Sequence, residues 1–212
     1  MTARVELPTA RGRQTQAAID AAARTVIARK GILATTIADI AAEAGRSTAS
    51  YYNYYDSKEA MVREWAVRFR DEARERAMAA AQPGLTDAER AHAAAAAHWN
   101  TYRHRLAEII AVSQLATVSE DFAQYWAEIC ALPIALITTM VQRAQRNGCC
   151  AGDDAHLIAV ALVSMLNQFC YTQLSGTGAQ TADDDACIST LAAIFHRTIY
   201  HKERTQPWRR RA

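Results

Sequence analysis

The segment 35–58 constrains what this chain can fold into more than any other stretch. Thr36 stands three residues before Asp39, the spacing of a capping box, and this predicts the start of a short helix. Apolar residues then recur at helical spacing up to Gly45, a residue that commonly ends helices in the left-handed conformation. Ser47 follows as the predicted cap of a second short helix. Two short helices joined by a tight glycine-containing turn predict a helix-turn-helix.

The second predicted helix carries side chains suited to a DNA surface. Its first residues are small, which lets a backbone approach base edges in the major groove. Hydroxyl and amide groups follow, and these can contact phosphate oxygens. Arg46 in the turn can read a guanine or hold a phosphate, and the sequence leaves both open. We expect base contacts from Arg46, Thr48, Ala49, Ser50 and Asn53, phosphate contacts from Thr36, Tyr52, Tyr54 and Lys58, and Ser47 at the helix start.

These residues resemble the signature of the TetR family of bacterial transcriptional regulators. Three positions depart from the family pattern: Arg46 replaces an apolar residue, Tyr51 a small aliphatic one and Asp56 a proline. The resemblance implies a homodimer, paired through its last two helices, that represses from a palindromic double-stranded DNA operator and responds to a small ligand. Activation instead of repression stays open. The matching residues are Thr35, Thr36, Ile37, Ile40, Ala41, Ala44, Gly45, Ser47, Tyr52, Tyr54, Tyr55, Ser57 and Lys58.

The remainder of the chain predicts helices throughout. Only 8 Gly and 4 Pro occur in the sequence, alanine runs are frequent, and no Asn-Gly or Asp-Gly turn separates alternating apolar segments. We expect an all-α protein with an N-terminal three-helix helix-turn-helix DNA-binding domain and a larger C-terminal helical domain for ligand binding and dimerisation. The expected parts are a flexible basic arm at 1–13, the DNA-binding domain at 14–60 with its motif at about 36–55, the C-terminal domain at 61–204 and a basic tail at 205–212.

Caps and apolar periodicity locate the individual helices. Glu59 three residues after Asp56 predicts that a long helix opens at Asp56, and Thr86 with Glu89 repeats the same spacing. The C-terminal segments are strongly apolar, so each must be covered by its own domain or by a second subunit. Besides the helix-turn-helix, we expect helices at about 14–30, from 56 to before 82, 86–102, 106–118, from 119 to before 148, 154–174 and 184–203.

Aromatic and polar residues of the C-terminal half are candidates for an effector pocket. Taken singly each suits an ordinary core, but together they would give an apolar wall with a few polar anchors. The segments 119–126 and 183–191 are similar in layout to the ethionamide-resistance type of repressor from actinobacteria. This similarity implies an elongated lipophilic effector, such as a fatty-acyl, sterol-like or drug molecule. The candidate residues are Trp99, Tyr102, Phe122, Tyr125, Trp126, Met140, Met165, Asn167 and Phe169.

The cysteines and histidines predict no metal or cofactor. Five cysteines, an odd number at irregular spacing, fit a reducing compartment and buried thiols. Cys149 and Cys150 follow a predicted helix stop, so we expect them to be exposed enough to react, and a thiol redox sensor is an alternative function. The six histidines never fall three or four residues apart, which argues against ligation from one helix face.

Net charge and the motifs present limit which other classes of protein this chain can belong to. The net charge of +2, with +3 over residues 1–58, is compatible with phosphate contact but small for an architectural DNA binder. No nucleophile–base spacing, phosphate loop or paired carboxylates occur, so we do not expect an enzyme, although an apolar helical cavity keeps that rival open. The uncharged stretch 157–182 is near the ~20-residue minimum for a membrane span, but polar residues interrupt it, and we expect no membrane partner. With no apolar run before Gln14, we expect a cytoplasmic protein.

Overall fold

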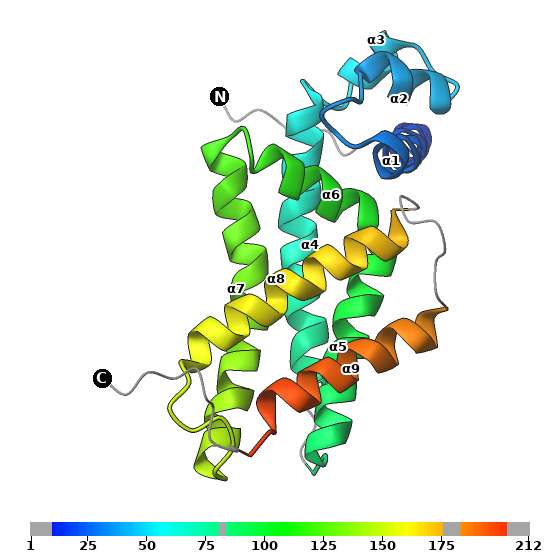
Figure 1. The fold of residues 1–212 in the computed structure, drawn as a ribbon. Helices are drawn as coiled ribbons and strands as arrows, with labels where there is room; N and C mark the ends of the chain where they lie inside the picture. Colours follow the sequence, from blue (N-terminus) through cyan, green and yellow to red (C-terminus); the bar gives the residue numbers. More distant parts are fainter. Residues whose placement is uncertain (1–9, 81–83, 176–182, 203–212) are drawn as a thin grey trace. The chain divides into compact units, whose positions relative to one another are not determined.

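The computed structural model describes residues 10–80, 84–175 and 183–202, and for 70–80 the backbone alone. Over these residues the chain forms helices and no strand, so the expected all-α fold is confirmed (Figure 1). The helices are α1 (Ala10–Lys30), α2 (Ile37–Glu43), α3 (Thr48–Tyr52), α4 (Lys58–Ala80), α5 (Asp87–His104), α6 (Leu106–Leu115), α7 (Glu120–Arg146), α8 (Ala155–Leu174) and α9 (Asp184–Ile199).

The chain divides into two compact units. The first, the N-terminal unit, takes in the residues up to Phe69 together with Leu106–Tyr125. The second, the C-terminal unit, takes in Arg70–Arg105 and the chain from Trp126 onward. The expected boundary lies after residue 60, whereas this division puts the start of α4 in the N-terminal unit and adds α6, which packs on α1.

Helix α1 supplies the core of the N-terminal unit. Ile19, Ala23, Val26 and Ile27 are completely buried, and their spacing places them on one face of the helix. Each of the buried isoleucine and valine side chains contributes roughly 1.5–3 kcal/mol. This face packs against α2 and α6, so the short α2 owes its stability to tertiary contacts rather than to its own length.

Helix α1 begins earlier than its apolar periodicity indicates. Its first residue is Ala10, so Arg11, Gly12 and Arg13 lie in helical turns, whereas the expected flexible arm runs to residue 13. The hydroxyl of Thr15 donates to the carbonyl of Arg11 at 3.1 Å, a bond between residues one turn apart. These turns are polar and exposed, and hydrophobic periodicity therefore gives no signal there. The rest of the expected arm and the basic tail at 205–212 lie outside the described residues.

The helix starts show which caps the sequence identifies correctly. Thr86 and Glu89 form the expected capping box, and α5 begins at the next residue. Helix α4 begins at Lys58 and not at Asp56: the Ser57 hydroxyl accepts the Ala60 amide at 3.0 Å. The predicted Asp56 start is therefore wrong, because Ser57 offers the same short polar side chain one residue closer to the helix.

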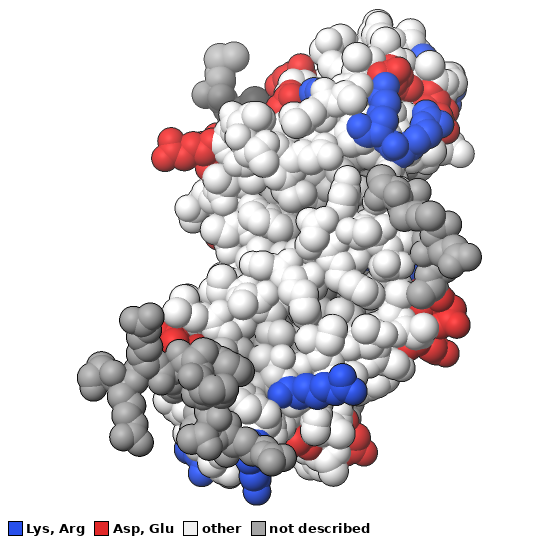
Figure 2. Space-filling model, in the orientation of Figure 1, with Lys and Arg blue, Asp and Glu red and all other residues white. Residues whose placement is uncertain are grey.

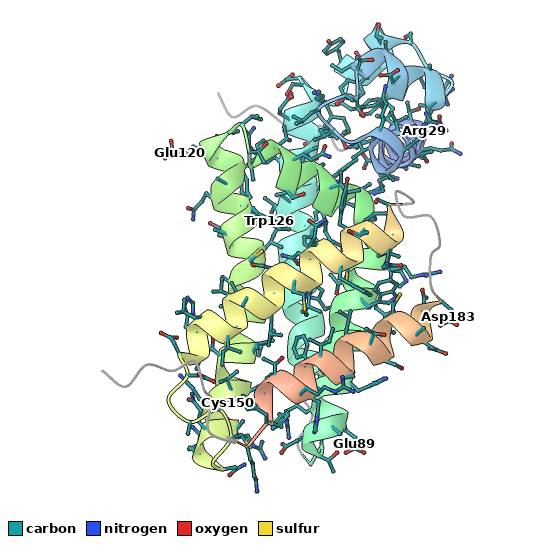
Figure 3. The ribbon with its side chains drawn as sticks, viewed as in Figure 1. Arg29, Glu89, Glu120, Trp126, Cys150 and Asp183 are labelled. Atoms are coloured by element: carbon teal, nitrogen blue, oxygen red, sulfur yellow. The ribbon has the colours of Figure 1, made fainter. Side chains whose placement is uncertain are left out.

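The C-terminal unit is built around α5, on which both α8 and α9 pack. Leu191 and Phe195 of α9 are completely buried, and Trp99 of α5 is almost so. The Trp99 ring lies 6.2 Å from the ring of Phe169 on α8, centroid to centroid. Asp183 caps α9 by accepting the Ala186 amide at 2.7 Å (Figure 3). The Trp99–Phe169 contact thus joins α5 to α8, and the Asp183 cap sets the start of α9.

Helices α7 and α8 are long and apolar enough to cross a membrane by length and composition alone. Only 11% of the most apolar window of α7 and 28% of that of α8 are buried within the described chain. Figure 2 shows a broad surface without charged side chains, and α8 itself contains no Lys, Arg, Asp or Glu. An uncharged surface of this extent over such helices is a candidate contact surface for a partner.

Candidate functional site

The first helix of the helix-turn-helix starts with a complete capping box. The Thr36 hydroxyl accepts the Asp39 amide at 3.1 Å, and the Asp39 carboxylate accepts the Thr36 amide at 2.8 Å. Lys30 at the end of α1 donates to the same carboxylate at 2.6 Å. The hydrogen bonds from Lys30 and Thr36 hold the pKa of Asp39 well below its ordinary value. Asp39 therefore joins α1 to α2 as well as capping α2.

The turn between α2 and α3 has the geometry that its glycine predicts. Gly45 has φ +61, and its amide donates to the carbonyl of Ala42 at 3.1 Å. The amide of Arg46 reaches back to the carbonyl of Ala41 at 2.9 Å, which completes a Schellman motif. The Ser47 hydroxyl then accepts the Ser50 amide at 3.2 Å and starts α3, as predicted.

Helix α3 divides its residues between an exposed face and a buried one. Thr48, Ala49 and Asn53 are exposed, and Tyr52 is 54% exposed. Tyr51 is completely buried. These exposed residues form the candidate DNA-contacting surface. Their hydroxyl and amide groups can form hydrogen bonds with phosphates and base edges, and their methyl groups can make apolar contacts with bases.

Tyr51 shows why its departure from the family pattern does not disturb the fold. Its hydroxyl donates to the carbonyl of Ser57 at 3.1 Å, and its ring lies against Tyr55 with centroids 5.6 Å apart. Burial raises the pKa of Tyr51 above its ordinary value. The phenol therefore stays neutral and holds α3 against the start of α4.

Asp20 of α1 is the centre of a second anchor. The Tyr55 hydroxyl donates to its carboxylate at 2.7 Å, and the Trp65 indole N–H lies 3.4 Å from the same oxygen. Gln16 donates to the Tyr55 hydroxyl at 3.1 Å. Burial, with the hydrogen bond to Asp20, raises the pKa of Tyr55. This network ties α1, the end of the helix-turn-helix and α4 together.

Lys58, predicted to hold a phosphate, has bonds inside the unit. Its ammonium donates to the carbonyls of Ile32 at 2.8 Å and Thr35 at 2.9 Å. These bonds occupy two of the three N–H donors of an ammonium group. Lys58 thus fastens the segment between α1 and α2 to the first turn of α4. Only its third N–H donor is left for a phosphate.

Helix α6 also contacts the segment between α1 and α2. The Gln114 side-chain oxygen accepts the Ile32 amide at 2.9 Å, beside Gly31 with φ +77. The Glu108 carboxylate is buried and accepts from Arg24 of α1 at 2.8 Å. A buried carboxylate is stable only with such partners. Gln114 and Glu108 thus fasten α6 to α1 and to the segment that follows it.

The expected effector residues fall into both units. Phe122 and Tyr125 belong to the N-terminal unit, where their rings lie 5.8 Å apart. The remaining seven belong to the C-terminal unit. There Trp99 meets Phe169, while Tyr102 is buried and stacks with the His98 ring at 5.3 Å. The half-buried members of this unit are Trp126 and Met140 on α7 (Figure 3 labels Trp126) and Met165, Asn167 and Phe169 on α8.

Sequence reasoning missed the polar centre of this group. The His98 ring nitrogen Nε2 lies 3.1 Å from the side-chain oxygen of Asn167, whose amide contacts the Cys130 sulfur at 3.6 Å. Burial lowers the pKa of His98 to about 4, against the opposing effect of Asn167. His98 is therefore neutral near pH 7. Metal-ligand spacing among the histidines does not single out His98. Its position next to Trp99, a candidate pocket residue, is the signal that could have identified it.

Two buried polar atoms nearby have no hydrogen-bond partner among the described residues. These are the indole N–H of Trp99 and the side-chain oxygen of Gln173. Gln173 lies one turn beyond Phe169 on the same face of α8. An unpaired buried donor or acceptor costs about 1–3 kcal/mol, so a ligand that pairs with either gains affinity from it.

The two loop cysteines are buried, and the expected exposure is wrong. Cys149 is 7% exposed and Cys150 not at all. The turn after α7 folds against the end of α9: the Cys150 amide donates to the carbonyl of His201 at 3.3 Å, and its thiol lies 3.0 Å from the carbonyl of Ile199. A glycine stop predicts the turn, but not the chain that covers it.

Comparison with solved structures gives the same fold. A bacterial regulatory protein of the tetR family from Rhodococcus RHA1 is similar with a TM-score of 0.72 at 20% identity, over 88% of this chain and 97% of that chain. A transcriptional regulator from Saccharomonospora viridis in complex with choline gives 0.69 at 21%, over 88% and 97%. The fatty acid degradation regulator FadR from Bacillus halodurans gives 0.61 at 19%, over 90% and 98%. No curated protein sequence matches the chain at a significant level.

Two known sequence families account for most of the described helices. Residues 19–65 match the bacterial regulatory proteins of the tetR family. Residues 91–201, just over half of the chain, match the C-terminal domain of the transcriptional regulator EthR. The first match contains the capped helix-turn-helix, and the second contains the cluster around His98 and Trp99. The chain therefore belongs to the TetR family of bacterial transcriptional regulators, with a C-terminal domain of the EthR type.

Proposed function

We propose that this protein is a homodimeric repressor that binds a palindromic operator and leaves it when a small lipophilic effector enters the C-terminal unit. The unpaired indole N–H of Trp99, beside the aromatic ring of Phe169, carries this proposal. Ligand pockets generally combine apolar walls with a few polar anchors, and these two residues would supply both. The neutral His98 and Asn167 supply further anchors that need no charged ligand.

The exposed face of α3 is the proposed base-reading surface. Thr48, Ala49, Ser50 and Asn53 would meet base edges, and Arg46 in the exposed turn would reach a base or a phosphate. Thr36, Tyr52 and Tyr54 would position the unit on the phosphates. Lys58 contributes chiefly by holding the segment that precedes α2, given its two carbonyl partners.

A dimer through α8 and α9 is the proposed assembly. The exposed residues Leu157, Ala161, Ser164 and Gln168 follow one another at four- and three-residue steps along α8, so they share a face. Leu157 is 65% exposed. An exposed face without a charged side chain suits packing against a second copy of itself. Two such subunits would place two α3 helices in successive major grooves, about 34–36 Å apart.

The effector would act by changing which arrangement of the dimer is populated. Helices α4 and α7 each run through the division between the two units. Ligand volume added in the C-terminal unit can therefore bias the N-terminal units towards a spacing that no longer fits the operator. By linkage the operator must weaken effector binding by the same factor.

The first test measures melting temperature across a panel of small molecules at fixed salt and protein concentration. The panel holds fatty acids, sterols and quaternary ammonium compounds including choline. A ligand at 100 times its dissociation constant should add about 2.7 kcal/mol to stability. A molecule that raises the melting temperature should also release the protein from a DNA fragment of the neighbouring promoter.

A Trp99→Phe variant then tests the site. It keeps the ring and removes the N–H, so a ligand bonded there should lose about 2- to 12-fold in affinity, the worth of one hydrogen bond. Operator binding without ligand should not change. Equal ligand affinity in wild type and Trp99→Phe would show that the ligand binds at another site. If no panel member reduced DNA binding, the release mechanism would be contradicted.

A further inference from the structure

Three side chains of different chemistry converge where the turn after α7 meets the end of α9 (Figure 3 labels Cys150). The Cys150 sulfur, an Asp153 carboxylate oxygen and a His201 ring nitrogen all lie within 4.8 Å of one another. Cys150 is buried, whereas Asp153 and His201 are half-buried. The cluster lies within the C-terminal unit, and it shares no residue with the group around Trp99 and His98.

The distance between the Cys150 sulfur and the His201 ring fits a tetrahedral metal ion. The Cys150 sulfur lies 3.6 Å from Nδ1 of His201. Two ligands at about 2.3 Å (sulfur) and 2.0–2.1 Å (nitrogen) from a tetrahedral zinc ion are themselves about 3.6 Å apart. The carboxylate of Asp153 offers the third ligand type that zinc accepts, at about 2.0–2.2 Å. We propose that Cys150, Asp153 and His201 bind a Zn²⁺ ion.

The backbone around the cluster is held in place. The Gln145 side-chain amide donates to the carbonyls of Cys150 at 3.2 Å and Asp153 at 2.7 Å. The Asp153 amide donates to the Cys150 carbonyl at 3.2 Å, closing the turn. Cys150 has φ +47, a conformation that costs a non-glycine residue about 1–2 kcal/mol. The chain thus keeps its cysteine in a strained conformation that aims the sulfur at His201.

Two of the three groups that would bind the ion lie against backbone carbonyls. The Cys150 thiol lies 3.1 Å from the Thr198 carbonyl and 3.0 Å from that of Ile199, and Nδ1 of His201 lies 2.9 Å from the Thr198 carbonyl. Zinc binding requires a thiolate and a neutral imidazole with a free nitrogen, so it would displace the thiol proton and any proton on Nδ1. The nearby carbonyl oxygens carry partial negative charge that favours a cation.

A catalytic triad is the other use of such residues, and the geometry opposes it. In a triad the nucleophile and the carboxylate approach opposite nitrogens of the imidazole. Here the Cys150 sulfur and the Thr198 carbonyl both approach Nδ1. The sulfur is also completely buried, so no substrate can reach it. A thiolate, an imidazole and a carboxylate together favour zinc over magnesium or calcium, which prefer oxygen ligands.

The ion would fasten the turn after α7 to the end of α9. Cys150 and Asp153 belong to the turn, and His201 follows the last residues of α9. Because the metal binds the folded chain, its binding free energy adds to the stability of the C-terminal unit. Zinc availability would then modulate a unit proposed to form the dimer and hold the effector.

The test uses untagged full-length protein, freed of metal with a chelator and titrated with Zn²⁺ under reducing conditions. We expect one zinc ion per chain and a rise in melting temperature. Co²⁺ in place of zinc should give the charge-transfer absorption of a thiolate ligand. Cys150→Ser should weaken Zn²⁺ binding by on the order of 100-fold or more and abolish that absorption. Cys149→Ser, which changes the neighbouring buried thiol, should leave both unchanged.

The variant His201→Gln keeps the test decisive if Cys150→Ser does not fold, as judged by circular dichroism. It should show the same loss of Zn²⁺ affinity with the thiol in place. Equal Zn²⁺ affinity in wild type, Cys150→Ser and His201→Gln would overturn the proposal, because surface histidines would then account for the binding. Absence of Zn²⁺ binding by the wild type would overturn it as well.

Discussion

The side-chain oxygen of Gln114 in α6 accepts the backbone N–H of Ile32, the first residue after the Gly31 that ends α1, at 2.9 Å. Gln114 therefore satisfies a buried amide between α1 and α2. We expect Gln114→Leu to leave that amide unpaired and to lower the free energy of unfolding by about 1–3 kcal/mol. Chemical denaturation measures the change. Gln142→Ala on the exposed side of α7 is the matched control and should have almost no effect; equal losses in both would show that the bond to Ile32 is unimportant.

The two glycines that flank α2 should differ in their tolerance of alanine. A Cβ on Gly31 would lie 2.5 Å from the Gln114 oxygen, whereas a Cβ on Gly45 meets nothing within 4 Å. Both have positive φ, so each substitution carries about 1–2 kcal/mol of backbone strain. Gly31→Ala should cost more in addition, because Gln114 can move away only by giving up its bond to Ile32. A melting curve that ranks Gly45→Ala as the more damaging change would contradict this.

Protonation of His98 should destabilise the protein in mild acid. Its folded-state pKa of about 4 lies below the ordinary value of 6.5, so the unfolded chain binds a proton first as pH falls. Stability from this group is complete above about pH 6.5 and is lost between there and pH 4, by up to about 3 kcal/mol. Unfolding free energies between pH 4 and 7.5 should show a shallower decline for His98→Gln. His92→Gln, at an exposed position, should follow wild type.

Substitutions on α3 and in the turn before it should separate overall affinity for DNA from preference between DNA sequences. Tyr52→Phe removes one exposed hydroxyl, and we expect it to weaken binding to all DNA sequences by a similar factor. Ser50→Ala and Arg46→Ala should instead change the ranking of operator variants, each by about 1–3 kcal/mol at the affected base pair. Fluorescence anisotropy with a set of single-base operator variants at one salt concentration distinguishes the two patterns. Uniform losses for all three substitutions would contradict the assignment of base contacts.

A charge on the exposed face of α8 should break the proposed dimer. Leu157→Glu places a carboxylate where two copies would meet, and burying it without a partner is unfavourable. Light scattering should then report a monomer that retains its helical content, with operator affinity reduced because one half-site is lost. Leu33→Glu, at a position 51% exposed in the N-terminal unit, should remain a dimer. A dimeric Leu157→Glu protein would place the interface on another surface.

The features that the sequence predicts best are local ones. Thr36 caps α2 with Asp39, and Gly45 ends it, because a cap depends on residues within one turn. The predicted start of α4 is wrong by two residues. Asp56 and Ser57 are both short polar side chains that can cap a helix, and spacing alone does not decide between them.

Contacts between distant residues could not be predicted. The burial of Cys150 depends on the chain around Ile199, which follows it by 49 residues. His98 looks like an ordinary surface histidine in sequence until Asn167 is placed beside it. Periodicity indicates which face of a helix is apolar, but not which partner covers that face.

The buried position of Tyr51 has an evolutionary consequence. Helix α3 is only five residues long, and its orientation depends on Tyr51 and on the network around Asp20. The exposed residues Thr48, Ala49 and Asn53 take no part in that support. Mutations at these three positions can therefore accumulate without unfolding the protein, and duplicated copies of the gene could diverge in the promoters they control while keeping one scaffold.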